Sequence, residues 1–167
     1  MEGKVWKYGD DINTDLIYPG RYTYIMLGRE EMASHALEDL DERFTKEGKS
    51  GDILVAGFNW GCGSAREQAV KALTARGVGA IIAKGFSRIY FRNALNEGLP
   101  VIVCPEAVDA IESGEKITID LCSHEIRTQA GRFSFPAFDP YLQGIMSDGG
   151  LIPHVRRELG ITPENTK

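Results

Sequence analysis

Three short apolar runs, separated by two segments of helical length, constrain the fold of this chain more than any other feature. The runs cover residues 52–58, 80–83 and 101–104, and apolar residues at helical spacing occupy 65–75 and 87–96 between them. A nearly continuous apolar strand suits a sheet that is covered on both faces. A strand–helix–strand repeat implies right-handed crossovers between parallel strands. The sequence therefore predicts an α/β fold with a mostly parallel central sheet.

The flanking segments predict further elements around this core. Residues 5–8 alternate like a strand, residues 9–22 form a loop rich in turn residues, and apolar spacing predicts one helix over about 29–46. Downstream, the sequence predicts a short helix near 106–112, a hairpin of 116–121 and 125–129, a third strand near 133–135, and helices near 141–147 and 151–159. Because no repeat or linker interrupts the chain, we expect one domain over 1–167, with a disordered tail from about residue 161.

Composition and charge argue against several functional classes. The net charge is −5 and no Lys/Arg run occurs, so nothing favours a nucleic-acid partner. The longest apolar stretch is far shorter than the ~20 residues that cross a bilayer, and no signal peptide is recognisable, so we expect a cytoplasmic chain without a membrane partner. Cys62, Cys104 and Cys122 lack the spacing of a metal site and are too few for a four-thiolate cluster. We therefore expect no metal site in this chain.

A glycine-rich turn between a strand and a helix is the best candidate site. Gly61 and Gly63 allow the backbone to approach a ligand, and the following helix would present free N–H groups to an anion. Arg66 is predicted in the first helical turn, where a cation opposes the helix dipole, which suggests a grip on a carboxylate or phosphate. A structural alternative exists, because Ser64 and Glu67 have the spacing of a capping box.

The order of motifs along the chain resembles that of a known family. Residues 61–69, GCGSAREQA, resemble the G-x-G-S-S-R-E-H-A signature of the swivelling domain of the aconitase superfamily. The opening motifs in 5–22 and the KGFSRIYFRNA segment at 84–94 resemble those of its small subunits, and the GGL at 149–151 matches their closing motif. The resemblance runs from about residue 4 to 156. It implies a swivelling β/β/α domain.

This resemblance also implies an activity and a partner. Isopropylmalate isomerases, homoaconitases and close relatives interconvert 2-hydroxy and 3-hydroxy acids through a cis-alkene. In them a large subunit carries a [4Fe–4S] cluster, whose open iron acts as a Lewis acid on the departing hydroxyl. The chain is thus expected to be the small subunit of a hydro-lyase, to bind no cofactor itself, and to act on a small di- or tricarboxylic hydroxy acid only together with its large subunit. In isolation, a homo-oligomer is expected.

Residue roles follow from the same resemblance. Ser64 matches the serine whose alkoxide removes a proton from the carbon next to a carboxylate, and Arg66 matches the arginine that binds a substrate carboxylate. Asp15 matches the active-site aspartate of the N-T-D motif, although a turn-forming aspartate is the alternative. Arg21 is the candidate for a second carboxylate contact, with an ordinary surface arginine as the alternative.

The chain departs from the family signature at two positions. Ala65 replaces the usual second serine, so that its backbone N–H would have to serve the substrate or the oxyanion. Gln68 replaces the usual histidine, which we interpret as a packing change. Arg88 and Arg92 match the family as well, and for them an ion pair or a subunit contact is the favoured interpretation.

The segment after Tyr22 bears on the substrate. Tyr24 and Ile25 belong to an apolar stretch with no cation before Arg29. Such a stretch accommodates an alkyl group and leaves an additional carboxylate unpaired, which favours isopropylmalate and hence leucine biosynthesis. The loop is one residue longer than usual, so a homoaconitase using Arg29 and a dimethylmalate or other alkyl-malate dehydratase stay open. A non-catalytic anion-binding module is the alternative from another class.

Overall fold

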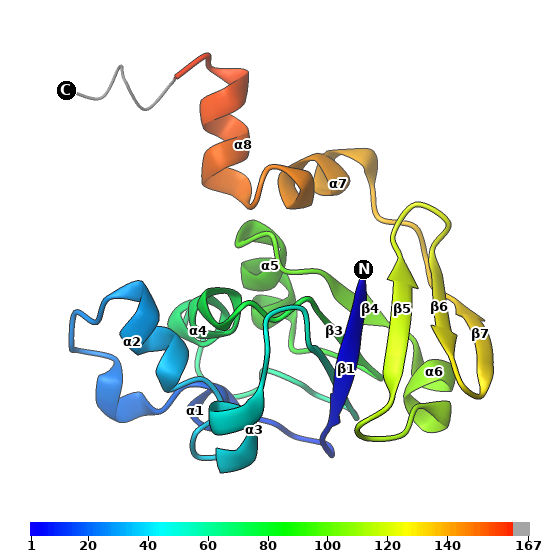
Figure 1. The fold of residues 1–167 in the computed structure, drawn as a ribbon. Coiled ribbons are helices and arrows are strands. Elements are labelled where there is room, and N and C mark those ends of the chain that lie inside the picture. The colour runs from blue at the N-terminus through cyan, green and yellow to red at the C-terminus, as the bar shows by residue number, and fades with distance from the viewer. Residues whose placement is uncertain (162–167) are drawn as a thin grey trace.

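A single curled sheet organises residues 1–161, the part of the chain that this computed structural model describes (Figure 1). Its strands are β1 (Glu2–Lys7), β2 (Ile53–Ala56), β3 (Ala80–Ala83), β4 (Val101–Val103), β5 (Lys116–Asp120), β6 (Glu125–Thr128) and β7 (Gly131–Ser134). Across the sheet their order is β4-β3-β2-β1-β5-β6-β7. The strands β1 to β4 pair in parallel, and β5 to β7 extend the sheet from β1 in antiparallel pairs. The predicted α/β class, the parallel core and the hairpin are confirmed.

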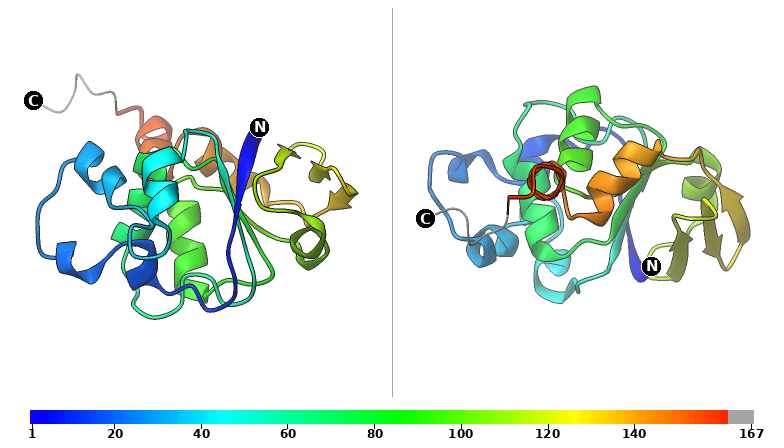
Figure 2. Two further views of the ribbon diagram at one scale, coloured as in Figure 1. Left: turned by 60° about the horizontal axis from the view of Figure 1, so that its bottom comes forward. Right: turned by 90° about the horizontal axis from the view of Figure 1, so that it is seen from above.

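Helices cover both faces of the parallel strands. They are α1 (Thr14–Ile17), the 3₁₀ helix η1 (Gly20–Tyr22), α2 (Arg29–Ser34), α3 (Glu42–Glu47), α4 (Gln68–Arg76), α5 (Arg88–Asn96), α6 (Pro105–Ala110), α7 (Pro140–Ser147) and α8 (Leu151–Glu158). Figure 2 shows α6 and the antiparallel strands on the opposite side of the parallel strands from α4 and α5. Leu54 packs in the core on the α4 side, whereas Ile53 and Val55 pack in the core that includes α6. Because both faces are covered, the central strands β2 and β3 are apolar and buried at every position.

The predicted single helix over about 29–46 is wrong, because two short helices replace it. Leu37 lies between α2 and α3 with a left-handed φ of 60°, and its N–H donates to the Ile17 carbonyl at 2.9 Å. The Asp41 side chain then accepts from the backbone N–H of Phe44 and caps α3. The apolar spacing continues across this break because Leu37 and Phe44 pack in the same core.

Helix α4 begins later than predicted, at Gln68, because the glycine turn continues beyond Cys62. Gly61 and Gly63 have left-handed φ angles of 76° and 90°, and Cys62 between them forms an isolated parallel bridge with Asn13. This pairing holds the chain in a non-helical path.

The capping box proposed as a structural alternative for Ser64 is also wrong. Glu67 is the N-cap residue of α4 and its side chain makes no capping hydrogen bond, so Ser64 lies before the helix. Upstream, the predicted loop over 9–22 contains α1 and η1. The Asn13 side chain caps α1 by accepting from the Leu16 N–H at 3.0 Å.

The description of the structure ends at residue 161. The predicted tail starts at the last described residue, and 162–167 lie outside the described residues. Among the helices within 1–161, none has the length and apolar character required to cross a membrane.

Candidate functional site

The loop between β2 and α4 meets the start of α5 at the carboxyl edge of the parallel strands. The Trp60 N–H donates to the Gly85 carbonyl at 3.0 Å, and the Ser87 N–H donates to the Trp60 carbonyl at 2.9 Å. The Ser87 hydroxyl, which also caps α5, donates to the Gly61 carbonyl at 2.7 Å. Together these segments form an open cleft of about 470 Å³, lined by Gly63, Ser64, Ala65, Ser87, Arg88, Ile89 and Arg92.

Gly61 allows the loop to pass directly over α5. A Cβ at this position would lie 2.1 Å from Cγ of Tyr90, a contact that no side chain tolerates. Tyr90 is buried against Trp60, and this burial raises the pKa of its phenol well above the ordinary value. Tyr90 is therefore a neutral packing residue that sets how closely the loop approaches α5.

Ser64 lies exposed in the cleft with its backbone fixed and its hydroxyl free. Its N–H donates to Oγ1 of Thr14 at 3.1 Å, and Thr14 itself is 1% exposed. Within residues 1–161 the Ser64 hydroxyl makes no hydrogen bond, and the backbone N–H groups of Ala65 and Arg66 meet no backbone acceptor. Such free amides beside a hydroxyl supply the partial positive charge that stabilises an oxyanion.

Arg66 and Asp15, both predicted from the sequence, form an ion pair next to the Ser64 loop. Nη2 of Arg66 lies 2.6 Å from Oδ1 of Asp15, and Nη1 donates to the Thr23 hydroxyl at 2.9 Å. The Arg66 side chain is 16% exposed and that of Asp15 is 61% exposed. Nε of Arg66 is buried and meets no acceptor in the described part of the chain. The prediction that Arg66 lies in the first turn of α4 is wrong, because it precedes the helix.

Of the predicted site residues, only Ser64 and Ala65 line the cleft: Arg66 and Asp15 lie beside its loop, and Arg21, Tyr24 and Ile25 lie outside it. Arg21 forms ion pairs with Glu38 and with Asp39, the second at 2.7 Å, and its guanidinium lowers the pKa of the Asp39 carboxyl. Tyr24 is 97% exposed and Ile25 is also exposed. Their segment reaches the Arg66–Asp15 pair through the hydrogen bond between Thr23 and Arg66 and through Gly20, which packs against both side chains.

Sequence reasoning missed the contribution of α5 to the cleft. It favoured an ion pair or a subunit contact for Arg88 and Arg92, yet both line the cleft together with Ser87 and Ile89. A signal was present. The segments that follow β2 and β3 leave the same edge of a parallel sheet, and residues 88 and 92 share one face of a helix.

The cysteines do not form a cluster site. Cys62 is partly buried in the glycine turn, Cys104 is buried at the end of β4, and Cys122 is exposed beyond β5. Burial raises the pKa of the Cys104 thiol, which disfavours the thiolate that a metal requires. No group of three His, Cys, Asp or Glu side chains suited to a metal ion was found in residues 1–161. The donors of this chain therefore do not fit an iron–sulfur cluster.

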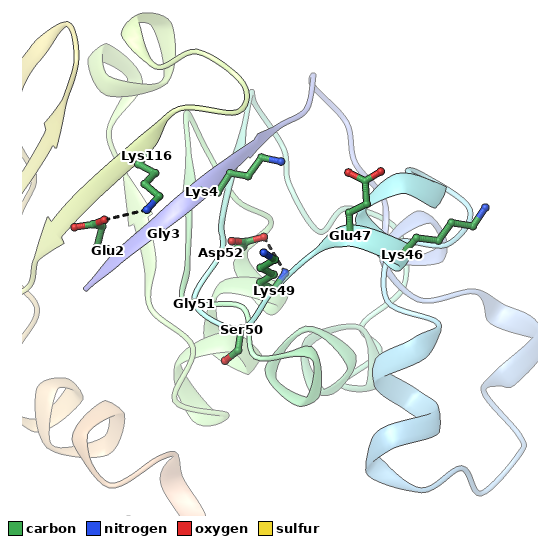
Figure 3. Close-up of a pocket in the computed structure, with 10 residues that line it drawn as sticks. All are labelled: Glu2, Gly3, Lys4, Lys46, Glu47, Lys49, Ser50, Gly51, Asp52 and Lys116. Carbon is green, nitrogen blue, oxygen red and sulfur yellow. Dashed lines mark hydrogen bonds and ion pairs between the residues drawn. The ribbon is translucent and has the colours of Figure 1, made fainter.

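A larger hollow, of about 690 Å³, lies at the opposite edge of the sheet (Figure 3). Figure 3 shows that its lysines do not converge on one point: Lys116 pairs with Glu2 at 3.7 Å, and Lys46 points away. Its buried carboxylate, Asp52, accepts from the Trp6 indole N–H at 2.8 Å and is structural. The smaller Ser64 cleft therefore carries the candidate chemistry despite its size.

Comparisons with known proteins show which family the chain resembles. Residues 10–107, which contain the Ser64 loop and α5, match the family described as the aconitase C-terminal domain. The chain is 48% identical to the 3-isopropylmalate dehydratase small subunit of Caldicellulosiruptor bescii, over 95% of this chain and 96% of that one. It is 46% identical to the methanogen homoaconitase small subunit of Methanothermobacter thermautotrophicus, over 95% and 92%. The crystal structure of a 3-isopropylmalate dehydratase from Methanocaldococcus jannaschii superposes with a TM-score of 0.89 at 40% identity, covering 96% of this chain and 95% of that one.

Proposed function

Because the chain belongs to the aconitase C-terminal domain family, we propose that it is the small subunit of a two-subunit hydro-lyase that isomerises 2- and 3-isopropylmalate in leucine biosynthesis. The observation that carries this proposal is that the Ser64 hydroxyl lies in an open cleft, makes no hydrogen bond within the described residues, and is next to free backbone N–H groups.

Ser64 is the proposed base of the reaction. Its alkoxide accepts the proton from the substrate carbon next to a carboxylate, and the electron pair left on that carbon forms the alkene as the hydroxyl departs. Serine is a weak base unless its charged form is stabilised. The backbone N–H groups of Ala65 and Arg66 are proposed to provide this stabilisation, because they donate to no backbone acceptor in the described residues and are free to donate to the alkoxide. The hydrogen bond to Thr14 keeps the Ser64 backbone in place.

Arg66 is proposed to bind one substrate carboxylate, and Asp15 is proposed as the catalytic aspartate that pairs with the Arg66 guanidinium. Its guanidinium is a charge-assisted donor, and because Nη2 and Nη1 contact Asp15 and Thr23 while Nε is buried, a substrate carboxylate has to displace one of these contacts. Ala65 contributes its backbone N–H to the substrate or the oxyanion in place of the usual serine hydroxyl. Arg21, Tyr24 and Ile25 are proposed to contact the substrate when their loop is brought over the cleft by the large subunit.

The substrate and the metal are further parts of the proposal. The apolar Tyr24–Ile25 stretch favours an alkyl-malate over a tricarboxylic acid. Homoaconitase is the second candidate, because one relative bears that name and Arg29 is the next cation along the loop. Since the cysteines of this chain do not fit a cluster, a [4Fe–4S] cluster is proposed on the large subunit alone. We further propose a cytoplasmic location and homo-oligomers of the isolated chain.

Replacing Ser64 with alanine tests this function in the pair reconstituted with a cluster-bearing large subunit. We expect kcat with 2-isopropylmalate to fall on the order of 100-fold or more, with little change in KM, because only proton removal is lost. Ser123→Ala, on the exposed turn after β5, is a matched control that should leave kcat unchanged. A normal kcat in Ser64→Ala would exclude Ser64 as the base. Turnover of homocitrate but not isopropylmalate by the wild-type pair would transfer the assignment to homoaconitase.

A further inference from the structure

The proposed substrate needs more positive charge than Arg66 provides. Isopropylmalate carries two carboxylates, whereas two nitrogens of the Arg66 guanidinium already contact Asp15 and Thr23. Arg21, which the sequence suggested for the second carboxylate, is held by Glu38 and Asp39. One carboxylate is therefore left without a partner among the predicted residues.

Helix α5 supplies two guanidiniums to the cleft. Arg88 and Arg92 both line it together with Ser64, and both are exposed. Neither forms an ion pair or a hydrogen bond through its side chain with any residue in 1–161, in contrast to Arg66 and Arg21. Both also line a smaller hollow with Phe86, Phe91 and Val103, so they are cations at the surface that pair with no residue of the described chain.

The position of this arginine pair is unfavourable for the helix itself. Arg88 is the first residue of α5, where a positive charge opposes the helix dipole. Arg92 follows four residues later, so the two like charges are neighbours on one helical face. No acidic residue on α5 offsets them. These two arginines destabilise the helix and have no compensating contact in the described chain, which points to a ligand.

We propose that Arg88 and Arg92 form the subsite for the second substrate carboxylate, an inference that rests on the proposed function. Guanidinium groups present paired N–H donors that match the two oxygens of a carboxylate. With Ser64 on the facing loop, the subsite anchors the substrate while the base acts. Ile89, between the arginines in sequence and also in the cleft, offers an apolar surface to the alkyl part of the same molecule.

Steady-state kinetics of the reconstituted pair test this subsite. Arg88→Gln and Arg92→Gln should each raise KM for 2-isopropylmalate about tenfold to a hundredfold, because a charge-assisted hydrogen bond is lost. The KM of Arg92→Lys should lie between those of Arg92→Gln and the wild type, because lysine keeps the positive charge but cannot make the paired hydrogen bonds of a guanidinium. Arg132→Gln, an exposed arginine on β7, is the control and should leave KM unchanged. An unchanged KM in both glutamine variants overturns the proposal.

Two further measurements separate the outcomes. The dissociation constant of the two subunits should be the same for Arg88→Gln as for the wild type; weaker assembly with an unchanged KM at saturating large subunit assigns these arginines to subunit contact and overturns the subsite. If the wild-type pair does not turn over isopropylmalate, the proposed function fails, and the subsite is judged on the full chain alone by NMR titration with malate. Shifts of the Nε–H signals of Arg88 and Arg92 support it, and their absence refutes it.

Discussion

Replacing Gly61 with alanine should destabilise the chain by about 2–5 kcal/mol, because two separate costs add. The φ of Gly61 is 76°, a left-handed value that costs an L-residue about 1–2 kcal/mol. The new Cβ would also lie 2.1 Å from Cγ and 2.4 Å from Cβ of Tyr90, far inside the ~3.5–4.0 Å of a normal carbon contact. Tyr90 is packed against Trp60 and has no free space to enter, so overpacking adds about 1–3 kcal/mol.

Urea unfolding of the isolated chain measures this loss. We expect the midpoint to fall while the slope with denaturant stays constant, since the surface exposed on unfolding is the same. Gly114→Ala is a matched control, because Gly114 has a similar φ of 88° and a Cβ added there would meet nothing within 4 Å. The difference between the two variants therefore isolates the contact with Tyr90. Equal destabilisation of the two variants would refute the steric part of this reasoning.

Two other predictions concern the surroundings of Ser64 and the loop before it. Thr14→Val removes the acceptor of the Ser64 N–H, so we expect a loss of about 1 kcal/mol in urea unfolding and a lower kcat in the reconstituted pair; a normal kcat would show that this hydrogen bond does not position the base. Arg21 lowers the pKa of Asp39, so the ionised carboxylate stabilises the fold above its unfolded pKa of 3.8, and this contribution is lost as the pH falls through the lower folded pKa. The melting temperature of the wild type should consequently drop more steeply than that of Arg21→Gln below about pH 5, whereas parallel curves would contradict the assignment.

The parallel core was predictable from sequence because its cause is local. A strand such as Ile53–Ala56 must be apolar on both faces once helices cover both sides, and that pattern is visible without any tertiary information. The helix over 29–46 was not predictable in the same way. Its interruption depends on the N–H of Leu37 reaching the carbonyl of Ile17, a contact between segments that no local spacing encodes.

In the site, too, the features with a local cause were predictable and those that depend on tertiary contacts were not. The glycine turn around Ser64 was predictable because its backbone requirements are local, whereas the role of Ser64 came from the family resemblance. The start of α4 was misplaced because the bridge between Cys62 and Asn13 is a tertiary contact. The pairing of Arg66 with Asp15 joins two motifs that the family resemblance had already singled out. Arg88 and Arg92 enter the cleft only because β2 and β3 are neighbours, so strand order had to be known before their role became visible.

The open cleft sets a physical requirement on the assembled enzyme. While the cleft faces water, the guanidiniums of Arg88 and Arg92 are solvated, and a Ser64 alkoxide would be hydrated and weakened as a base. Covering the cleft removes that water and strengthens every electrostatic interaction inside it, including those of the free N–H groups of Ala65 and Arg66. The same covering would also remove water from the two guanidiniums, which costs free energy unless an anion is bound to them. Under the proposed function, the substrate carboxylates meet that need. Closure by the large subunit is then favourable when substrate is bound, which is also when a stronger base is useful.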